Sequence, residues 1–414
     1  MSDVNTTQHT AVALVAIDIA KRNHDVAILW PNGKTATMKI ANSKDGFQRL
    51  MEVVQRYGDP VHVAFEPTAD YHRNLAYWLQ NAGATCFLVS SLMSARAREL
   101  LFKTWDKNDR KDAQVILYLM RQNMMKPFYD PLVEGTMDIQ DLSNTYHQIS
   151  LARTRCQHSL INHYLTLYFP EMERFYHASR SEWFCCFLSK FPTPQSITRY
   201  KVATFVKRAW VIVGRKVAKQ RFLEEVHETA CRSIGLPVEL QGQAVKTFRI
   251  QLQRIIDLNQ LRQQLEKTSE TILSAREDYQ QLRSVPGIGP ICAMMIIAES
   301  GDLNRFGHYR QYLNFCGFNL CSTQSGQRQS KHKISKRGNS RLRYAYWLAA
   351  TIAIRQRENS FREKYERHIK SSPNNPDLKR KAVVAIACKL ARVCHSLVKQ
   401  NTPYRGYYEF NHGT

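Results

Sequence analysis

The chain has 414 residues, of which 43% are hydrophobic, and this length can bury the cores of two or three domains, which excludes a wholly disordered protein. Its 59 Lys and Arg residues outnumber its 35 Asp and Glu residues, and the resulting net charge of +24 favours a polyanionic partner over the alternative of a basic protein that binds no nucleic acid. The apolar stretch of residues 11–20 is about half a membrane span and the first ten residues lack the basic region of a signal peptide, so we expect no membrane span, no export and a cytoplasmic location.

Strand and helix patterns alternate over residues 1–126. The first apolar run, AVALVAIDIA, is interrupted by KRNHD and resumes as VAIL before the turn residues Pro31, Asn32 and Gly33. This pattern predicts a strand, a turn and a second strand. Such runs lie at residues 11–20, 26–29, 61–66 and 85–90, and helical patterns lie at residues 46–57 and 71–83. This alternation predicts an α/β domain with a mixed or parallel sheet that closes with helices near residue 125.

The strand signal fades over residues 127–275, where long helical patterns predict an all-α connector. One stripe of apolar residues steps by three or four positions, near the period of a coiled coil: Phe248, Leu252, Ile255, Leu258, Leu261 and Leu265. Dimerisation through this helix and an intramolecular helical hairpin explain the stripe equally well.

A third domain is predicted over residues 276–400, followed by a tail over residues 401–414. It begins with the sequence PGIGP, in which Gly287 and Gly289 precede an apolar helix, and it ends in helices from Arg341 to about Gln400. Backbone amides at a turn of the helix-hairpin-helix kind can hold a phosphate without reading sequence. A plain turn between two helices would have the same pattern.

The ten cysteines show no CxxC pair and no spacing typical of a zinc site. Because we expect a reducing compartment, we interpret them as reduced core thiols.

Acidic residues stand where a metal site could form. Asp18 and Glu66 each close an apolar run, so both could project from strand ends into one crevice. Asp106, Asp109 and Asp112 lie three residues apart and would share one helical face, which is costly unless cations neutralise it. Carboxylates from separate elements suit Mg²⁺ or Mn²⁺, and two such ions can bind the attacking and leaving oxygens of a phosphodiester. The alternatives are exposed acids at strand ends and a solvated helix face.

The sharpest basic cluster lies between residues 321 and 344. Lysine and arginine contacts to phosphate release counterions, so binding by such a cluster would be salt-sensitive. The alternative is a basic loop that is only solvated. Ser325, followed by Gly326, lies among these cations, which would stabilise a developing alkoxide, although Ser322, Ser330 and Ser335 are close rivals. The cations are Arg328, Lys331, Lys333, Lys336, Arg337, Arg341 and Arg343.

Together, these motifs are similar to those of the DEDD-type insertion-sequence transposases, the family that includes the Piv-type site-specific invertases. Their order is Asp18, Glu66, NDRKDA, PGIGP, QSG and ISKRGNSRLR, and the resemblance covers most of the chain. The first part resembles a RuvC-like (RNase H-like) nuclease domain, in which EPTADYH carries Glu66 and the D-x-x-D-A pattern supplies Asp109 and Asp112. Asp106 lies outside that pattern and is kept only as a reserve ligand.

The resemblance implies a DNA recombinase with Mg²⁺ or Mn²⁺ bound by Asp18, Glu66, Asp109 and Asp112 and with Ser325 as the nucleophile that forms a covalent link to DNA. It also implies double-stranded DNA as substrate, a structured noncoding guide RNA, and a homo-oligomer of two or four chains. Two alternatives remain. A structure-specific nuclease would cleave without a covalent link, and a catalytically silent protein would only bind nucleic acid.

Overall fold

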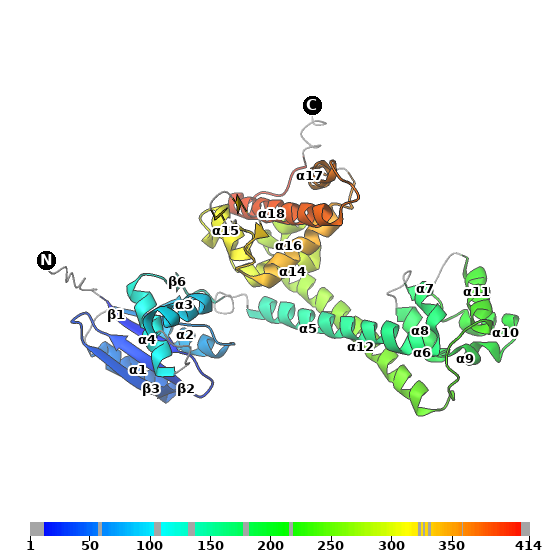
Figure 1. The fold of residues 1–414 in the computed structure, drawn as a ribbon, viewed down its shortest axis with the longest axis horizontal. Coiled ribbons are helices and arrows are strands. Elements are labelled where there is room, and N and C mark those ends of the chain that lie inside the picture. Colours follow the sequence, from blue (N-terminus) through cyan, green and yellow to red (C-terminus); the bar gives the residue numbers. More distant parts are fainter. Residues whose placement is uncertain are drawn as a thin grey trace. The chain divides into compact units, whose positions relative to one another are not determined.

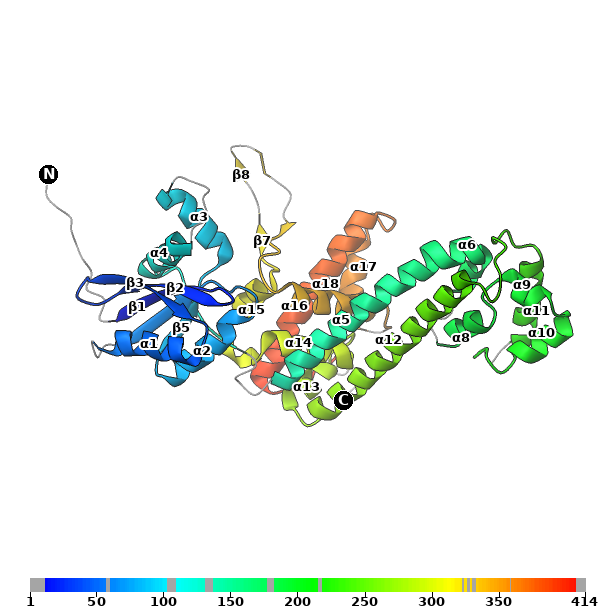
Figure 2. The same ribbon diagram turned by 90° about the horizontal axis from the view of Figure 1, so that it is seen from below.

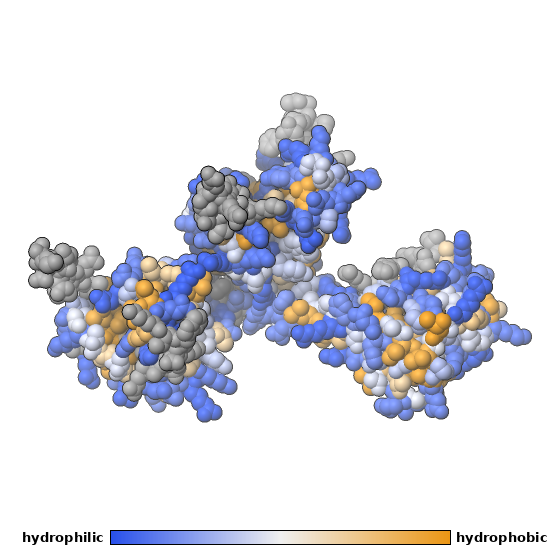
Figure 3. All heavy atoms as spheres, in the orientation of Figure 1, coloured by the Kyte–Doolittle hydropathy of each residue, from blue (hydrophilic) through white to orange (hydrophobic). Residues whose placement is uncertain are grey.

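A computed structural model describes residues 12–56, 60–102, 109–130, 137–176, 182–214, 218–321, 324–325, 328–329, 333–357 and 359–406. The chain divides into two compact units, Met1–Val133 and Glu134–Thr414, each of which we describe by itself (Figure 1). Most of the surface side chains in view are hydrophilic (Figure 3). Within these described ranges, no helix combines the length and the apolar character needed to cross a membrane.

A six-stranded sheet in the order β3-β2-β1-β4-β5-β6 forms the centre of the first unit. Its strands are β1 (Ala13–Asp18), β2 (Asn23–Leu29), β3 (Thr35–Ala41), β4 (Val61–Phe65), β5 (Thr85–Leu88) and β6 (Lys126–Pro127). β1, β4 and β5 run parallel, whereas β2, β3 and β6 pair antiparallel with their neighbours. This confirms the predicted mixed sheet. The sequence pattern missed β3, an edge strand in which polar and apolar side chains are mixed and only one of the seven is fully buried.

Helices cover both faces of this sheet (Figures 1 and 2). Alternate residues of β1 supply the two cores, since Ile17 packs with α1 (Lys44–Gln55) and α2 (Tyr71–Asn81), while Ala16 packs on the opposite face. That opposite face is covered by α3 (Ser91–Phe102) and α4 (Asp109–Arg121). The face under α4 is the one that matters for the candidate site.

The second unit is mostly helical, as predicted. Its early elements are α5 (Met137–Ser159), the π-helical η2 (Leu160–Leu165), α6 (Thr166–Tyr168), η3 (Pro170–Met172), α7 (Glu173–Tyr176), α8 (Glu182–Lys190), α9 (Pro194–Thr198), α10 (Val202–Ala209), α11 (Lys219–Cys231) and α12 (Gln243–Leu273). Its later elements are α13 (Glu277–Arg283), α14 (Pro290–Ser300), η4 (Leu303–Arg305), α15 (Tyr309–Cys316), β7 (Leu320–Cys321), β8 (Gln324–Ser325), β9 (Arg328–Gln329), β10 (Lys333–Ile334), α16 (Ser340–Ala353), α17 (Ser360–Ile369) and α18 (Pro376–Gln400).

Two separate hydrophobic cores stabilise this unit. One joins α13 to α18 with the first turns of α5, and the other lies within residues 160–242, which we call the helical subdomain, together with the adjoining parts of α5 and α12. α5 and α12 lie side by side in both views and connect the two cores (Figures 1 and 2).

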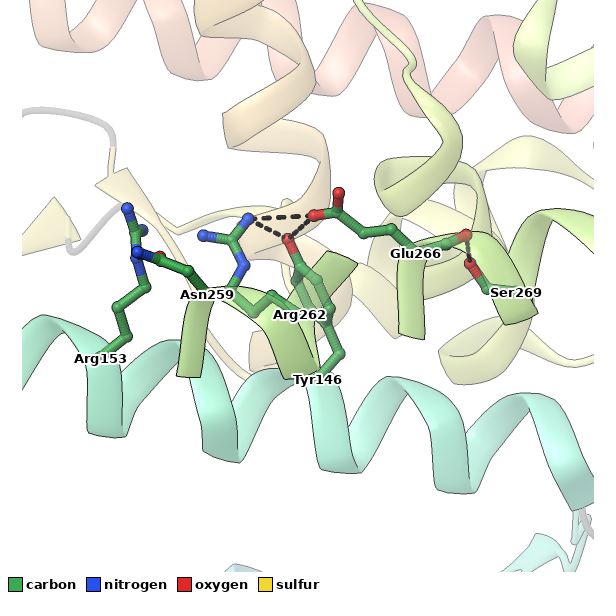
Figure 4. A network of polar contacts seen from close by, with 6 residues as sticks. All are labelled: Tyr146, Arg153, Asn259, Arg262, Glu266 and Ser269. Atoms are coloured by element: carbon green, nitrogen blue, oxygen red, sulfur yellow. Dashed lines mark hydrogen bonds and ion pairs between the residues drawn. The ribbon is translucent and has the colours of Figure 1, made fainter. Parts of the chain in front are cut away.

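The apolar stripe of α12 packs inside its own chain. Phe248, Leu252 and Ile255 are buried in the core of the helical subdomain, which supports the intramolecular hairpin, whereas Leu261 remains 45% exposed. Beyond the buried part of the stripe, polar side chains join α5 to α12 (Figure 4): Tyr146 donates to Glu266 at 3.0 Å, Arg262 contacts Tyr146 and Glu266, and Arg153 donates to Asn259. Within α12, the Ser269 hydroxyl donates to the Glu266 carbonyl. Dimerisation through α12 stays a prediction.

All ten cysteines lie in the described ranges and are free thiols. The prediction of core thiols is correct for six buried residues: Cys86, Cys156, Cys185, Cys292, Cys316 and Cys394. Cys186 and Cys388 are half-buried. The prediction is wrong for Cys231 and Cys321, which are exposed at the ends of a helix and a short strand.

Candidate active site

Asp18 and Glu66 occupy equivalent places on neighbouring parallel strands. Ile17 of β1 is in register with Phe65 of β4, so the next residues, Asp18 and Glu66, both stand at the carboxyl ends of these strands. Each is two residues beyond an alanine that faces α4, and strand alternation therefore places both on that face of the sheet. Both are half-buried. The strand ends thus present two carboxylates to one side of the sheet.

A third carboxylate belongs to α4, the helix that covers this face. Asp112 lies one turn into α4, and its side chain is only 6% exposed. Arg98 of α3 neutralises it, because Nε donates to Oδ1 at 2.7 Å and Nη2 lies 2.7 Å from the same oxygen. Both contacts use Oδ1, and within the described residues no hydrogen bond or ion pair engages Oδ2.

Asp25 and His24 also belong to this end of the sheet, and the sequence patterns indicated neither. Asp25 pairs directly with Asp18 across the β1–β2 ladder and forms an ion pair with Lys39 at 3.7 Å. His24 is fully buried, and its Nδ1 accepts a hydrogen bond from the backbone amide of Ala20, which fixes the turn after β1. Burial lowers the pKa of His24 below its ordinary value of 6.5, so the ring is held neutral.

The remaining predicted ligands are only partly within the described structure. Asp109 begins α4, but its side chain lies outside the described residues, as does Asp106 altogether. Among the side chains that the structure describes, no three acidic, histidine or cysteine groups form a metal site. Carboxylates are the ligand type that a hard divalent cation takes, and the structure places Asp18 and Glu66 on one face of the sheet and Asp112 on the helix that covers this face, without gathering the three around one point.

Ser325 lies in the second unit, in a short two-stranded hairpin. Its backbone in β8 is opposite Arg328 in β9, and the loop is closed at its base by β7 and β10, where Cys321 is opposite Lys333. The side chains of Ser325 and Arg328 lie outside the described residues, as do Gly326 and Lys331 altogether.

The basic residues after this hairpin divide into two groups. Lys333, Lys336 and Arg337 are exposed. The other two have partners inside the unit, since Arg343 donates to the carbonyl of residue 316 at 2.9 Å, and Arg341 pairs with Glu299 at 3.0 Å.

Packing accounts for the first glycine of the PGIGP turn. Gly287 has φ +88°, and a Cβ atom there would lie 2.3 Å from the carbonyl oxygen of Ala349 in α16. Gly289 caps the first turn of α14 and has more room, since its Cβ atom would meet only Arg283, at 3.9 Å. The close approach of α14 and α16 therefore explains Gly287 without a phosphate, and the predicted phosphate contact of this turn stays a prediction.

Comparison with known proteins agrees with the motifs. A DEDD transposase model of the IS110 group matches residues 15–170, and a model described as Transposase IS116/IS110/IS902 family matches residues 279–366, so the two matches together span more than half of the chain. A Streptomyces coelicolor mini-circle protein named as a putative transposase for IS117 is 26% identical over 82% of this chain and 83% of its own length. The transposase for insertion sequence element IS1111A of Coxiella burnetii is 31% identical over 34% of this chain and 38% of its own length.

Two weaker likenesses complete the comparison. The insertion element IS116 uncharacterized 44.8 kDa protein of Streptomyces clavuligerus is 22% identical over 84% of this chain and 86% of its own length. Among solved structures, T. thermophilus RuvC in complex with Holliday junction substrate matches 28% of this chain and 99% of its own at 13% identity, with a TM-score of 0.21 that is too low to carry an argument. The two family models therefore decide the assignment, and the chain belongs to the IS110-type DEDD transposase family.

Proposed function

We propose that this transposase cleaves and rejoins DNA strands with four carboxylates and a serine. The observation that carries the proposal is the register of β1 and β4, which ends both strands in an acid, Asp18 and Glu66, on the face covered by α4. α4 itself contributes Asp109 and Asp112. Four acids of this kind are the ligands expected for a nuclease that binds Mg²⁺ or Mn²⁺.

Mg²⁺ bound by Asp18, Glu66, Asp109 and Asp112 would act as a Lewis acid toward the phosphodiester. The chain's own contribution is to hold neighbouring acids on one face of the sheet and to pair two of them, Asp112 and Asp25, with cations. Arg98 pairs with Asp112 through one carboxylate oxygen only, which leaves the other oxygen for a metal ion. Lys39 forms an ion pair with Asp25, and this cation reduces the electrostatic repulsion between the carboxylates of Asp25 and Asp18, which are opposite each other on β2 and β1.

Ser325 would supply the nucleophile. Its oxygen forms an ester bond to phosphorus as the bond from phosphorus to one sugar oxygen breaks, and a sugar hydroxyl of the second strand then attacks the same phosphorus and releases the serine. The number of phosphodiester bonds is thereby conserved. The DNA backbone would be held by Gly287, Gly289, Gly326 and the cations Arg328, Lys331, Lys333, Lys336 and Arg337. Arg341 and Arg343 belong to the same predicted set, although both also have partners inside the unit.

Partners and domain limits complete the proposal. Double-stranded DNA is the substrate, a structured noncoding RNA guides the protein to it, and the active form contains two or four chains. The proposed domain limits are 1–126, 127–275, 276–400 and the tail 401–414. The net charge of +24 supports polyanionic partners of both kinds.

The test is a denaturing-gel assay for a covalent complex between the protein and labelled paired DNAs, with Mg²⁺ present or chelated. We expect an adduct with the wild type, no adduct with Ser325→Ala or Asp112→Asn, and an unchanged adduct with the matched control Ser322→Ala. An adduct that survives in Ser325→Ala would disprove the serine role. Loss of the adduct after ribonuclease treatment of protein with its co-purified RNA would support the guide.

A junction-resolving nuclease is the second candidate. The observation that favours it is that the carboxylates and Ser325 belong to different compact units, and hydrolysis would require only the first. This alternative predicts Mg²⁺-dependent cleavage by both wild type and Ser325→Ala, with no adduct in either.

A further inference from the structure

Most of the helical subdomain, residues 171–242, lies between the two family-model matches, which end at residue 170 and resume at residue 279. Its sequence is strongly biased in charge. Between Glu182 and Glu224 the chain has nine Lys or Arg residues and no Asp or Glu. A stretch of 41 residues with this bias needs a counter-charge from outside it.

The described cations of this stretch lie mainly on α10 and α11 and in the turn between α9 and α10, and these helices pack together beyond the end of the α5–α12 hairpin (Figures 1 and 2). We call six of them the cationic surface: Arg199, Lys201, Lys207, Arg208, Lys219 and Arg221. All are exposed except Lys219, which is half-buried. Figure 3 shows hydrophobic patches bordered by hydrophilic side chains on this part of the unit.

Aromatic rings hold three of these cations in place. The guanidinium carbons of Arg199 and Arg208 lie 4.7 and 4.5 Å from the centroid of the Tyr200 ring, and Arg208 also donates to the Tyr200 hydroxyl at 3.3 Å. Lys219 Nζ lies 5.0 Å from the Trp210 ring. The Tyr200 backbone is fixed in turn, because its carbonyl is 2.9 Å from His227 Nε2 of α11. Such contacts reduce the conformational freedom that each cation would lose on binding.

The cationic surface is unneutralised, in contrast to other cations of the same subdomain. Arg174 and Arg232 pair with Glu225 and Glu228, whereas among the described residues no carboxylate pairs with any of the six cations. Fixed and unpaired positive groups on a surface are what a phosphate backbone requires.

We propose that the cationic surface binds the phosphate backbone of duplex DNA, as a contact separate from both family-matched regions. Duplex is favoured over single strands because guanidinium groups lie over the Tyr200 ring and the Lys219 ammonium lies over the partly exposed Trp210 ring, so the surface offers these rings covered by charge rather than free for bases to stack on. The proposal rests on the proposed function only in taking DNA as the partner, and it is independent of the serine chemistry.

The test compares two full-length triple variants that change the charge equally. The first is Arg199→Ala, Arg208→Ala, Lys219→Ala, and the control is Arg174→Ala, Arg232→Ala, Lys246→Ala from the same subdomain and the adjoining first turn of α12. Binding to a duplex of about 30 base pairs and unrelated sequence is measured by fluorescence anisotropy over a salt series with chelator present, so that cleavage plays no part. The slope of log K against log salt should fall by about 0.9 for each phosphate that the first variant no longer neutralises, and should change little in the control.

Photocrosslinking on the otherwise wild-type chain gives a second measurement that does not depend on how the variants fold. p-Benzoylphenylalanine in place of Val211, which is 90% exposed and follows Trp210, should crosslink to the duplex, and the same group in place of Ile250 on α12 should not. Equal slopes for the two triple variants, or crosslinking at Ile250 but not at Val211, would overturn the proposal. A triple variant that loses binding to single-stranded RNA but keeps its duplex affinity would also overturn it.

Discussion

Replacing Arg341 distinguishes whether this residue contacts DNA or stabilises the fold through its ion pair with Glu299. The sequence places Arg341 in the basic cluster that we expect to contact DNA, whereas the structure gives its guanidinium a buried carboxylate, Glu299. Arg341 also donates to Ser143 at 3.1 Å and contacts Asn144, so it ties α16 to α5. We predict that Arg341→Ala acts mainly on stability.

The magnitude follows from the burial of the pair. The Glu299 side chain is 7% exposed and that of Arg341 is 26% exposed. Removing one member of a buried ion pair costs about 3–5 kcal/mol, and the lower value applies here because Arg341 is partly hydrated and Glu299 keeps a hydrogen bond from Asn339 at 2.7 Å. At about 2–3 °C for each kcal/mol in a unit of this size, the Tm should fall by roughly 6–9 °C.

Thermal melts and duplex-binding isotherms, measured on the same preparations, test this prediction. The control is the double variant Arg341→Met, Glu299→Gln, which removes both charges and should recover most of the lost Tm. If Arg341→Ala melts within about 1 °C of the wild type and instead loses DNA affinity, then the ion pair contributes little and the residue is a phosphate contact.

Three further predictions concern other parts of the chain. Gly287→Ala should lower the Tm, because it combines a positive φ with a Cβ atom 2.3 Å from the Ala349 carbonyl oxygen, a cost of about 2–3 kcal/mol; an unchanged melt would mean that α14 and α16 separate easily. The lowered pKa of His24 means that the unfolded chain takes up a proton first as the pH falls, so its contribution to stability is complete above about pH 6.5 and is lost below it. His24→Asn should flatten the Tm between about pH 5 and 6.5, and an identical profile would contradict this. Arg98→Ala should lower the Tm by leaving Asp112 without its cation, and millimolar Mg²⁺ should raise the Tm of this variant more than that of the wild type, unless Asp112 is not a metal ligand.

The parts of the fold that depend on local patterns could be predicted from the sequence. The strand ends of Asp18 and Glu66 follow from apolar runs that stop at an acid, α4 belongs to the helices expected to close the first domain, and α14 follows from the apolar run after the PGIGP turn. β3 was missed because an edge strand buries too few side chains to leave an apolar run.

The parts of the candidate site that depend on distant contacts could not be predicted. Arg98 is one helix away from Asp112, and nothing in its own neighbourhood marks it as a partner. Asp25 is recognisable only once the register of β1 and β2 is known. Arg341 looks like every other cation of its cluster until Glu299, 42 positions earlier in the chain, is placed beside it. A basic motif in a sequence therefore mixes residues that bind a ligand with residues that hold the fold.

The α5–α12 hairpin restricts how the length of this protein can change. Each residue added to one helix advances it by about 1.5 Å and turns it by about 100°, which would move Arg262 and Asn259 away from Tyr146 and Arg153. An insertion is tolerated only when both helices gain the same number of residues, and about seven residues restore the facing sides with a shift of roughly 10 Å. Insertions and deletions of one or two residues should therefore occur in the loops of the helical subdomain. The distance between this subdomain and the core formed by α13 to α18 should change only when both helices gain or lose about seven residues.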